Sequence, residues 1–227
     1  AGALRLEQVS SQTARVRAGG AITQTGALSL RGAASMEAGG AINLSRAGNV
    51  FGGALSLSGQ AGTVGASGPL ALGASTLTSL NVSSTGALSQ SGALIISGAT
   101  AIATTGDAVT LDMAGNRFGG GISVLTDGGG SAVADVALAS NAALSLGAIR
   151  AGSLAVTADG ALSQSAALTA TGDVSLTSNG ALTLNKDNQI TGDLDARSQG
   201  GKITVASFNT VIGGEMALNA RQGGTVG

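Results

Sequence analysis

The sequence lacks cysteine, histidine, tryptophan and tyrosine altogether. Without cysteine, neither a disulfide framework nor a thiolate metal site can form. Without histidine, the chain has neither the commonest metal ligand nor the commonest general base. It also has no run of eighteen apolar residues, so no segment is predicted to cross a membrane as a helix. We therefore expect no cofactor, no metal centre and no membrane insertion.

Charged residues are scarce as well: they make up 10% of the chain, whereas about 25% is typical of soluble domains. The formal net charge is −1, from eleven basic and twelve acidic residues. The first fifty residues lean basic, with five arginines against two glutamates. No segment carries the strong basic excess that nucleic-acid binding requires, so we expect no nucleic-acid partner.

Glycine and aliphatic residues are abundant by contrast, with 39 glycines and a hydrophobic share of 43%. Disorder needs low hydrophobicity and high net charge, so this chain should fold. Because there are three phenylalanines and one proline, the core must consist of thin layers of aliphatic side chains. The chain starts and stops within its own repeat pattern and shows no signal peptide, which we interpret as an internal fragment of a longer protein.

Three sequence features recur along the chain, and their spacing defines a long repeat. A GAxxQ segment is followed about 25 residues later by N-x-F-GG, and is preceded by an LxLG-like segment. The GAxxQ segment occurs at 20–24, 86–90 and 160–164. The N-x-F-GG segment occurs at 49–53 and 116–120, with a weaker copy, NQITG, at 188–192. The LxLG-like segment occurs at 4–7, 70–73 and 144–147. We predict three super-repeats of three coils each within a single β-helix segment spanning 1–227, at 13–78, 79–152 and 153–214.

Each coil of about twenty residues has a strand-like pattern. Apolar residues alternate with small polar ones in triplets such as LSL, LTL, VSL and ITV, which is typical of half-buried strands. Glycine, asparagine, aspartate and serine between the triplets permit tight turns. We predict a right-handed parallel β-helix of about ten coils of roughly 20 residues, because parallel crossovers are right-handed in the great majority of cases. Coils stacked about 4.8 Å apart would form a rod on the order of 50 Å long.

The candidate site positions are those that recur once in each super-repeat. We interpret the asparagines as bonding the backbone of their own turns, and the apolar residues two positions later as core residues. The glutamines either mark an exposed line along the rod or bond the backbone at corners. These positions are Asn49, Phe51, Asn116, Phe118, Asn188, Ile190, Gln24, Gln90 and Gln164.

Parallel β-helices also include polysaccharide lyases and hydrolases, for which clustered carboxylates would be the signature. No aromatic residue lies beside the acidic candidates to hold a sugar ring, so we interpret them as solvated charges and predict no catalytic residue and no enzyme. The segment DGGG at 127–130 has the wrong order for a calcium-binding nonapeptide and predicts a loop in the long unit 121–152. The acidic candidates are Asp107 with Asp112 and Asp193 with Asp195. A further arrangement, which we also reject, is a set of acidic metal ligands beside a basic residue, around Asp187, Asp193, Asp195 and Arg197.

Units such as DVSLTSNGALTLNKDNQITG (173–192), with the GALSQSGAL and N-x-F-GG segments, resemble the shaft repeats of filamentous haemagglutinin-like exoproteins. These are two-partner-secretion adhesins of Gram-negative bacteria, and the resemblance covers essentially the whole chain. It implies the structural shaft of a secreted adhesin that passes an outer-membrane transporter during export and is displayed at the bacterial cell surface. It also implies host-cell receptors or glycans as partners, contacted by this segment or by other regions of the parent protein. Two alternatives stay open: the shaft of a toxin-delivery exoprotein, and a β-helical polysaccharide-processing enzyme.

Overall fold

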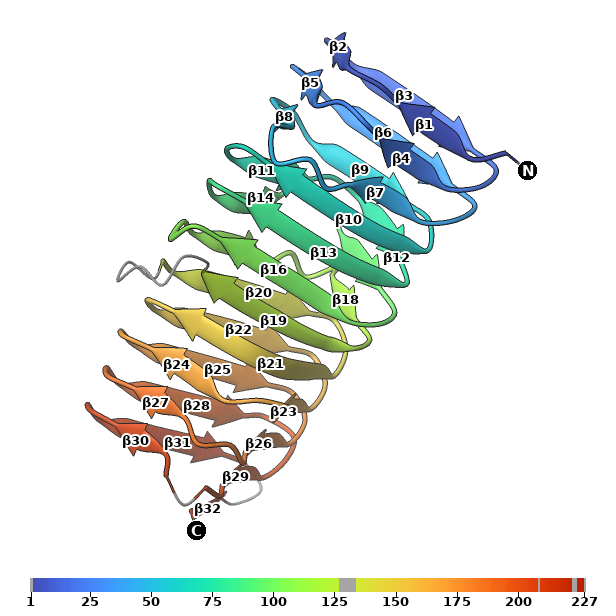
Figure 1. Ribbon diagram of the computed structural model, residues 1–227. Helices are drawn as coiled ribbons and strands as arrows, with labels where there is room; N and C mark the ends of the chain where they lie inside the picture. The colour runs from blue at the N-terminus through green and yellow to red at the C-terminus, as the bar shows by residue number, and fades with distance from the viewer. Residues whose placement is uncertain (1, 127–133, 208, 222–223, 227) are drawn as a thin grey trace.

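The computed structural model describes residues 2–126, 134–207, 209–221 and 224–226. Its parallel strands stack as a β-solenoid of about ten turns. The solenoid is an elongated rod, and its two termini lie at opposite ends (Figure 1). No helix occurs in these ranges. The predicted all-β solenoid fold is confirmed.

The strands form three parallel sheets, in which strands of successive coils pair with one another. The first sheet has 15 strands, namely β1 (Leu4–Leu6), β4 (Ile22–Gln24), β7 (Ile42–Leu44), β10 (Ala61–Ala66), β13 (Ser79–Ser84), β16 (Thr100–Thr104), β19 (Gly121–Thr126), β21 (Leu144–Ala151), β23 (Leu162–Gln164), β24 (Leu168–Ala170), β26 (Leu182–Leu184), β27 (Gln189–Ile190), β29 (Ile203–Val205), β30 (Val211–Ile212) and β32 (Gly224–Val226). The second sheet has 14 strands, namely β3 (Ala14–Ala18), β6 (Ala34–Ala38), β9 (Leu55–Ser58), β11 (Leu70–Leu72), β12 (Ser75–Leu77), β14 (Leu88–Gln90), β15 (Leu94–Ile96), β17 (Val109–Leu111), β18 (Arg117–Phe118), β20 (Val136–Ser140), β22 (Leu154–Ala158), β25 (Val174–Ser178), β28 (Leu194–Ser198) and β31 (Met216–Ala220). The third sheet has 3 strands, namely β2 (Val9–Ser11), β5 (Leu28–Leu30) and β8 (Val50–Phe51).

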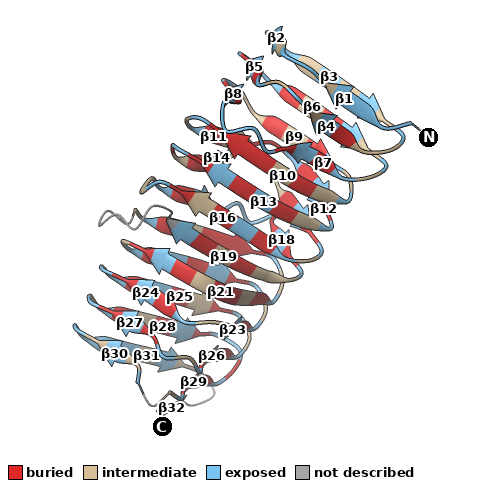
Figure 2. Ribbon diagram, in the orientation of Figure 1, coloured by how far each residue is buried: buried red, intermediate tan, exposed pale blue. Residues whose placement is uncertain are grey.

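The core is a continuous column of aliphatic side chains enclosed by the sheets. In β5, Leu28 and Leu30 are each 1% exposed, whereas Ser29 between them faces solvent. The same alternation continues from coil to coil, so that buried positions follow the strands along the rod (Figure 2). Full burial of a leucine side chain contributes about 1.5–3 kcal/mol, and this term, repeated in every coil, stabilises the stack. The end coils are more open: Leu4 is 38% exposed and Met216 is 42% exposed.

Buried hydroxyl groups close some of the corners at which strands end. Ser84 Oγ donates a hydrogen bond to the carbonyl of Gly68 (2.7 Å) or of Gly86 (2.8 Å). Ser140 also ends a strand and is 3% exposed. Its Oγ atom, however, has no hydrogen-bond partner within the described part of the chain. The two serines therefore have similar burial but opposite hydrogen-bonding status.

This contrast predicts opposite effects of the same substitution. We expect Ser84→Ala to lower the free energy of unfolding by about 1–2 kcal/mol, because it removes a buried hydrogen bond. Ser140→Ala should leave the free energy of unfolding unchanged or raise it by about 1 kcal/mol, because it removes an unpaired buried hydroxyl. Urea denaturation followed by far-ultraviolet circular dichroism compares the two variants. A larger loss of stability in Ser140→Ala than in Ser84→Ala would contradict this account.

Two long strands change how the sides of the rod are built. β9 pairs with β11 at one end and with β12 at the other, so one long strand is followed by two short ones on that side. β19 relates to the two parts of β21 in the same way, with a shift of register between Ile122 and Val124. On the opposite side of the rod, the strands become longer at the same points. In the first sheet, for example, the short strand β7 pairs with the long strand β10, which pairs with the long strand β13.

Successive super-repeats consequently lie half a turn apart around the rod. The strands β3 and β22, which open the units at 13–78 and 153–214, belong to the second sheet, whereas the equivalent β13 belongs to the first sheet. Each of the first two super-repeats thus forms about three and a half coils of the solenoid, whereas the sequence predicts three. The reason is that the LxLG segments at 70–73 and 144–147 start an extra half coil. The super-repeat boundaries themselves stay a prediction.

Candidate functional site

The recurring asparagine is buried, and its amide pairs with the amide of the recurring glutamine in a neighbouring coil. Asn116 is 0% exposed, and its Oδ1 atom accepts hydrogen bonds from the N–H of Leu94 (2.9 Å) and from Gln90 Nε2 (2.8 Å). Its Nδ2 atom donates to Gln90 Oε1 (2.8 Å) and to the carbonyl of Leu111 (3.0 Å). The two side chains thus bond each other twice and also close backbone groups of two coils. We call this arrangement an amide clamp.

The amide clamp recurs in all three super-repeats. Gln24 and Asn49 form the first one, and Gln164 and Asn188 form the third. All three asparagines are 0% exposed, and each accepts a hydrogen bond of 2.9 Å from a backbone N–H of the preceding coil. Because the asparagines are buried and the paired amides bond one another and the backbone, the clamp holds neighbouring coils together.

The clamp differs in two respects from what the sequence suggests. Asn116 bonds its own turn through Leu111, as expected, but its other partners Gln90 and Leu94 lie in the preceding coil. The glutamines also do not form one line, because Gln24 and Gln164 end strands of the first sheet whereas Gln90 ends a strand of the second. The nearly constant separation of each pair, 25, 26 and 24 residues, is the signal that could have revealed the pairing.

The apolar residue of each N-x-F-GG motif lies in the core. Phe51, Phe118 and Ile190 are 7%, 1% and 2% exposed, and all three belong to the continuous hydrophobic cluster. The glycines that follow stack closely on the preceding coil: a Cβ atom on Gly53 would lie 2.5 Å from the carbonyl carbon of Gly32. The motif is therefore a corner that combines an amide clamp, a core side chain and a close backbone contact.

The carboxylates Asp193 and Asp195 do not act together. Asp193 precedes β28, and its Oδ1 atom accepts a hydrogen bond from the N–H of Glu215 (2.7 Å). Asp195 lies within β28 and forms an exposed ion pair with Arg197, with 2.7 Å between Oδ2 and Nη2. One carboxylate thus caps a corner of the backbone, and the other neutralises an arginine.

Asp112 lines a shallow groove, whereas Asp107, the other member of its predicted pair, does not. The groove has a volume of about 360 Å³, and Asp159 also lines it. Asp159 was not among the sequence candidates, because it lies two coils further along the chain. Between the two carboxylates the lining is largely alanine: Ala114, Ala137, Ala139 and Ala155.

Asp187 interacts with polar groups of the next coil rather than with Arg197. Its carboxylate accepts hydrogen bonds from Ser207 Oγ and from Asn209 Nδ2 (3.4 Å). These bonds, chiefly the one from Ser207, lower the pKa of Asp187. The hydrogen bond from Arg197 to Asp195 raises the pKa of the Arg197 guanidinium. In the described ranges, no three acidic side chains lie close enough together to hold a metal ion.

The unit 121–152, for which the sequence predicts a loop at 127–130, is described in part. Residues 121–126 form β19, which pairs with β16. Residues 127–133, including the DGGG segment, lie outside the described residues.

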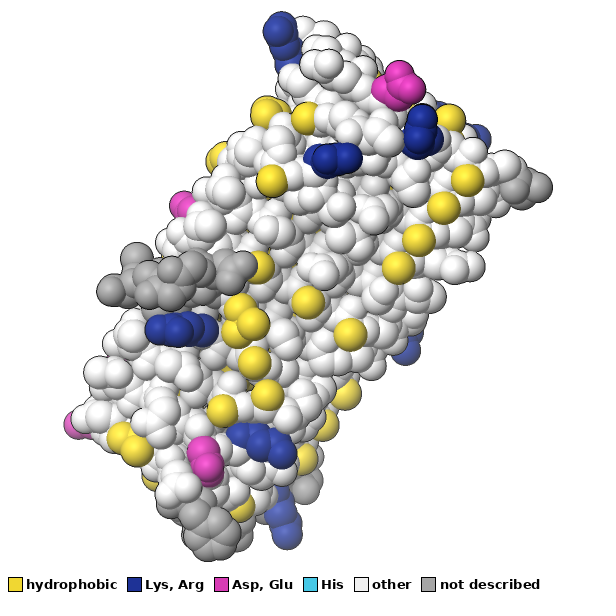
Figure 3. Space-filling view, in the orientation of Figure 1, with side chains coloured by type: hydrophobic (Ala, Val, Ile, Leu, Met, Phe, Trp, Pro, Cys, Tyr) yellow, Lys and Arg dark blue, Asp and Glu magenta, His cyan; other side chains and the backbone are white. Residues whose placement is uncertain are grey.

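A second groove indents the outer face of the second sheet near the C-terminal end of the rod. It has a volume of about 290 Å³, and all six residues that line it are polar, unlike those of the groove lined by Asp112 and Asp159. Charged side chains make up 10% of the chain, and they are widely spaced on the face in Figure 3. We call this the arginine groove; it is lined by Thr177, Arg197, Ser198, Gln199, Asn219 and Arg221.

Comparison with known families recognises the repeats. A family model described as repeats of unknown function (DUF5649) matches residues 1–58, 59–125 and 133–197. The chain belongs to this family. The second and third DUF5649 matches begin twenty residues, or one coil, before the super-repeats at 79–152 and 153–214. No curated protein and no solved structure matches the chain.

Within the described residues, no helix has the length and apolar character needed to cross a membrane.

Proposed function

We propose that this chain is the structural shaft of a secreted bacterial adhesin, displayed at the cell surface and serving attachment to host cells. The observation that supports this best is the uninterrupted ladder of parallel strands from β1 to β32 in the first sheet. Because neighbouring coils are joined by backbone hydrogen bonds along the rod, its length increases with the number of coils. A shaft needs this property and needs no reactive site.

The adhesin part of the proposal is supported by the sequence. The unit at 173–192 and the GALSQSGAL and N-x-F-GG segments resemble the shaft repeats of filamentous haemagglutinin-like exoproteins. The absence of cysteine suits export of an unfolded chain through an outer-membrane transporter, because no disulfide has to form first. The parent protein would then present host-cell receptors or glycans with a recognition surface held away from the bacterium.

The test measures how far the chain holds a marker from a surface. The chain is tethered by its C-terminus to a supported membrane and carries a fluorophore at its N-terminus. A second form contains a duplicate of residues 13–152 inserted after residue 152, where β21 precedes β22 as β1 and β2 precede β3. The duplicate adds about seven coils, so the fluorophore should rise by about 34 Å.

The matched control replaces the duplicate by a Gly/Ser segment of equal length. The end-to-end distance of such a segment grows roughly with the square root of its length and is broadly distributed. The duplicated coils should instead give a narrow distribution of heights. A height that the duplicate leaves unchanged, or a distribution as broad as that of the control, would argue against the shaft.

A further inference from the structure

The arginine groove brings together side chains from three successive coils of the second sheet. The register aligns Thr177 of β25 with Arg197 of β28, and Arg197 with Asn219 of β31. Gln199 and Arg221 follow the ends of β28 and β31, so they lie beyond this row at the same edge of the sheet. The result is a row of hydroxyl, guanidinium and amide groups at steps of about 4.8 Å, with a second guanidinium next to it.

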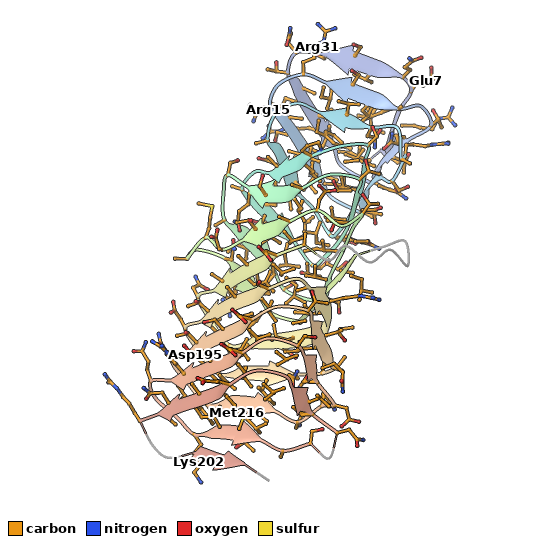
Figure 4. All side chains as sticks on the ribbon, turned by 90° about the vertical axis from the view of Figure 1, so that its left-hand side faces the viewer. Glu7, Arg15, Arg31, Asp195, Lys202 and Met216 are labelled. Carbon is orange, nitrogen blue, oxygen red and sulfur yellow. The ribbon has the colours of Figure 1, made fainter. Side chains whose placement is uncertain are left out.

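Arg197 is held in one orientation by a neighbour on its own strand. Its Nε and Nη2 atoms donate to the Asp195 carboxylate at 3.1 Å and 2.7 Å. The Nη1 group is not used in this pair. Figure 4 shows Asp195 on the last coils of the rod, at the opposite end from Arg15 and Arg31. A fixed guanidinium loses less conformational entropy when it binds an anion.

The groove keeps a positive charge after this ion pair is counted. Arg197 and Arg221 both line the groove. Asp195 neutralises Arg197, so the remaining positive charge comes from Arg221. Asp193 lies at the other end of β28, four residues before Arg197, which is roughly 13 Å along an extended strand. Such a distance exceeds the Debye length of about 8 Å at physiological ionic strength, so the negative charge of Asp193 reduces the positive potential of the groove only slightly.

The chemistry of these groups selects the class of ligand. Guanidinium groups bind carboxylate and sulfate oxygens through paired hydrogen bonds, while the amides of Asn219 and Gln199 and the hydroxyl of Thr177 suit sugar hydroxyls. Strand addition by a peptide is excluded at β28, because both edges of this strand are already paired, with β25 and with β31. A volume of about 290 Å³ is just below the usual range for small-molecule sites and suits one or two sugar rings.

We propose that the arginine groove binds an acidic saccharide, with Arg197 and Arg221 holding a carboxylate or sulfate group and Thr177, Gln199 and Asn219 bonding the sugar hydroxyls. This assigns a binding activity to the rod's own surface, beyond its role as a shaft. It does not depend on that role, because the height measurement above and the binding measurement below can succeed or fail separately.

The experiment titrates the folded chain with three probes by isothermal calorimetry. A heparin-derived tetrasaccharide carries sulfate groups, sialyllactose carries a carboxylate alone, and lactose is the neutral control. We expect at least one acidic probe to bind and lactose not to bind, and the comparison of the two acidic probes identifies the anionic group. Binding of lactose as tight as that of the acidic probes, or binding of no probe at millimolar concentration, would overturn the proposal.

Variants separate the groove from general attraction of anions. The double variant Arg197→Gln/Arg221→Gln should weaken binding of the acidic probe at least tenfold, whereas Arg117→Gln, an exposed arginine of β18, should not change it. Asn219→Ala should weaken binding severalfold without changing the charge. An equal loss in Arg117→Gln and in the double variant would overturn the proposal; circular dichroism verifies that each variant is folded.

Discussion

Replacing Asn116 by alanine is expected to lower the free energy of unfolding by about 3 kcal/mol or more. The side chain is fully buried, and alanine would leave the N–H of Leu94, the carbonyl of Leu111 and both amide atoms of Gln90 without their present partners. Each buried polar group left unpaired costs about 1–3 kcal/mol. Urea denaturation monitored by far-ultraviolet circular dichroism measures the change.

The matched control for this prediction is Asn81→Ala. Asn81 lies in the middle of β13 but faces solvent, so its removal should change the free energy of unfolding by less than about 0.5 kcal/mol. Equal stabilities of the two variants would show that the amide clamp contributes nothing beyond an exposed amide. Gln90→Ala tests the clamp from its other side, and should be less costly because Asn116 keeps its bonds to Leu94 and Leu111.

Replacing Gly53 by alanine is expected to be similarly costly, by about 3 kcal/mol, although it adds a single methyl group. The new Cβ atom would lie 2.5 Å from the carbonyl carbon of Gly32 and 2.6 Å from the nitrogen of Ala33. Both are backbone atoms of the preceding coil, so the overlap can be relieved only by separating two stacked coils. Thermal and urea denaturation should both show the loss.

Gly48→Ala serves as the control for this effect. The nearest atom to a Cβ on Gly48 is the Cβ of Ala27, at 3.5 Å, which is an ordinary van der Waals contact. The variant should therefore be neutral, or more stable by about 0.4–1 kcal/mol, because alanine restricts the unfolded chain more than glycine does. If Gly48→Ala and Gly53→Ala destabilise the protein equally, the close stacking of coils at the N-x-F-GG corner is not the cause.

The sequence alone predicts the fold because its main signals are local. Triplets such as Leu182-Thr183-Leu184 show the alternation of a strand within three residues, and the structure has a strand at these positions. The same local pattern predicts that the apolar residues of the N-x-F-GG motif belong to the core, where the structure has them. Repetition then requires the coils to stack, because one coil alone cannot bury its apolar face.

The interactions between coils are harder to predict because they depend on coil length. Gln90 and Asn116 are 26 residues apart, and they meet only because the intervening coil returns Asn116 to a position next to Gln90. The arginine groove depends likewise on the registers Thr177↔Arg197 and Arg197↔Asn219. The sequence does not predict the half-turn between super-repeats, for a different reason. The strands β9 and β11 differ in length, but both sequences show the same alternating pattern of a short strand.

The half-turn also determines how such a rod could engage several ligands at once. A surface group carried once per super-repeat recurs about every 17 Å along the axis, but neighbouring copies point to opposite sides, and copies on the same side are about 34 Å apart. A flat array of receptors can therefore occupy every second copy, and avidity is gained only by a ligand or linker that spans this longer distance. Two separate surfaces could bind the two sides of one rod at the same time, which would make it a bridge between them.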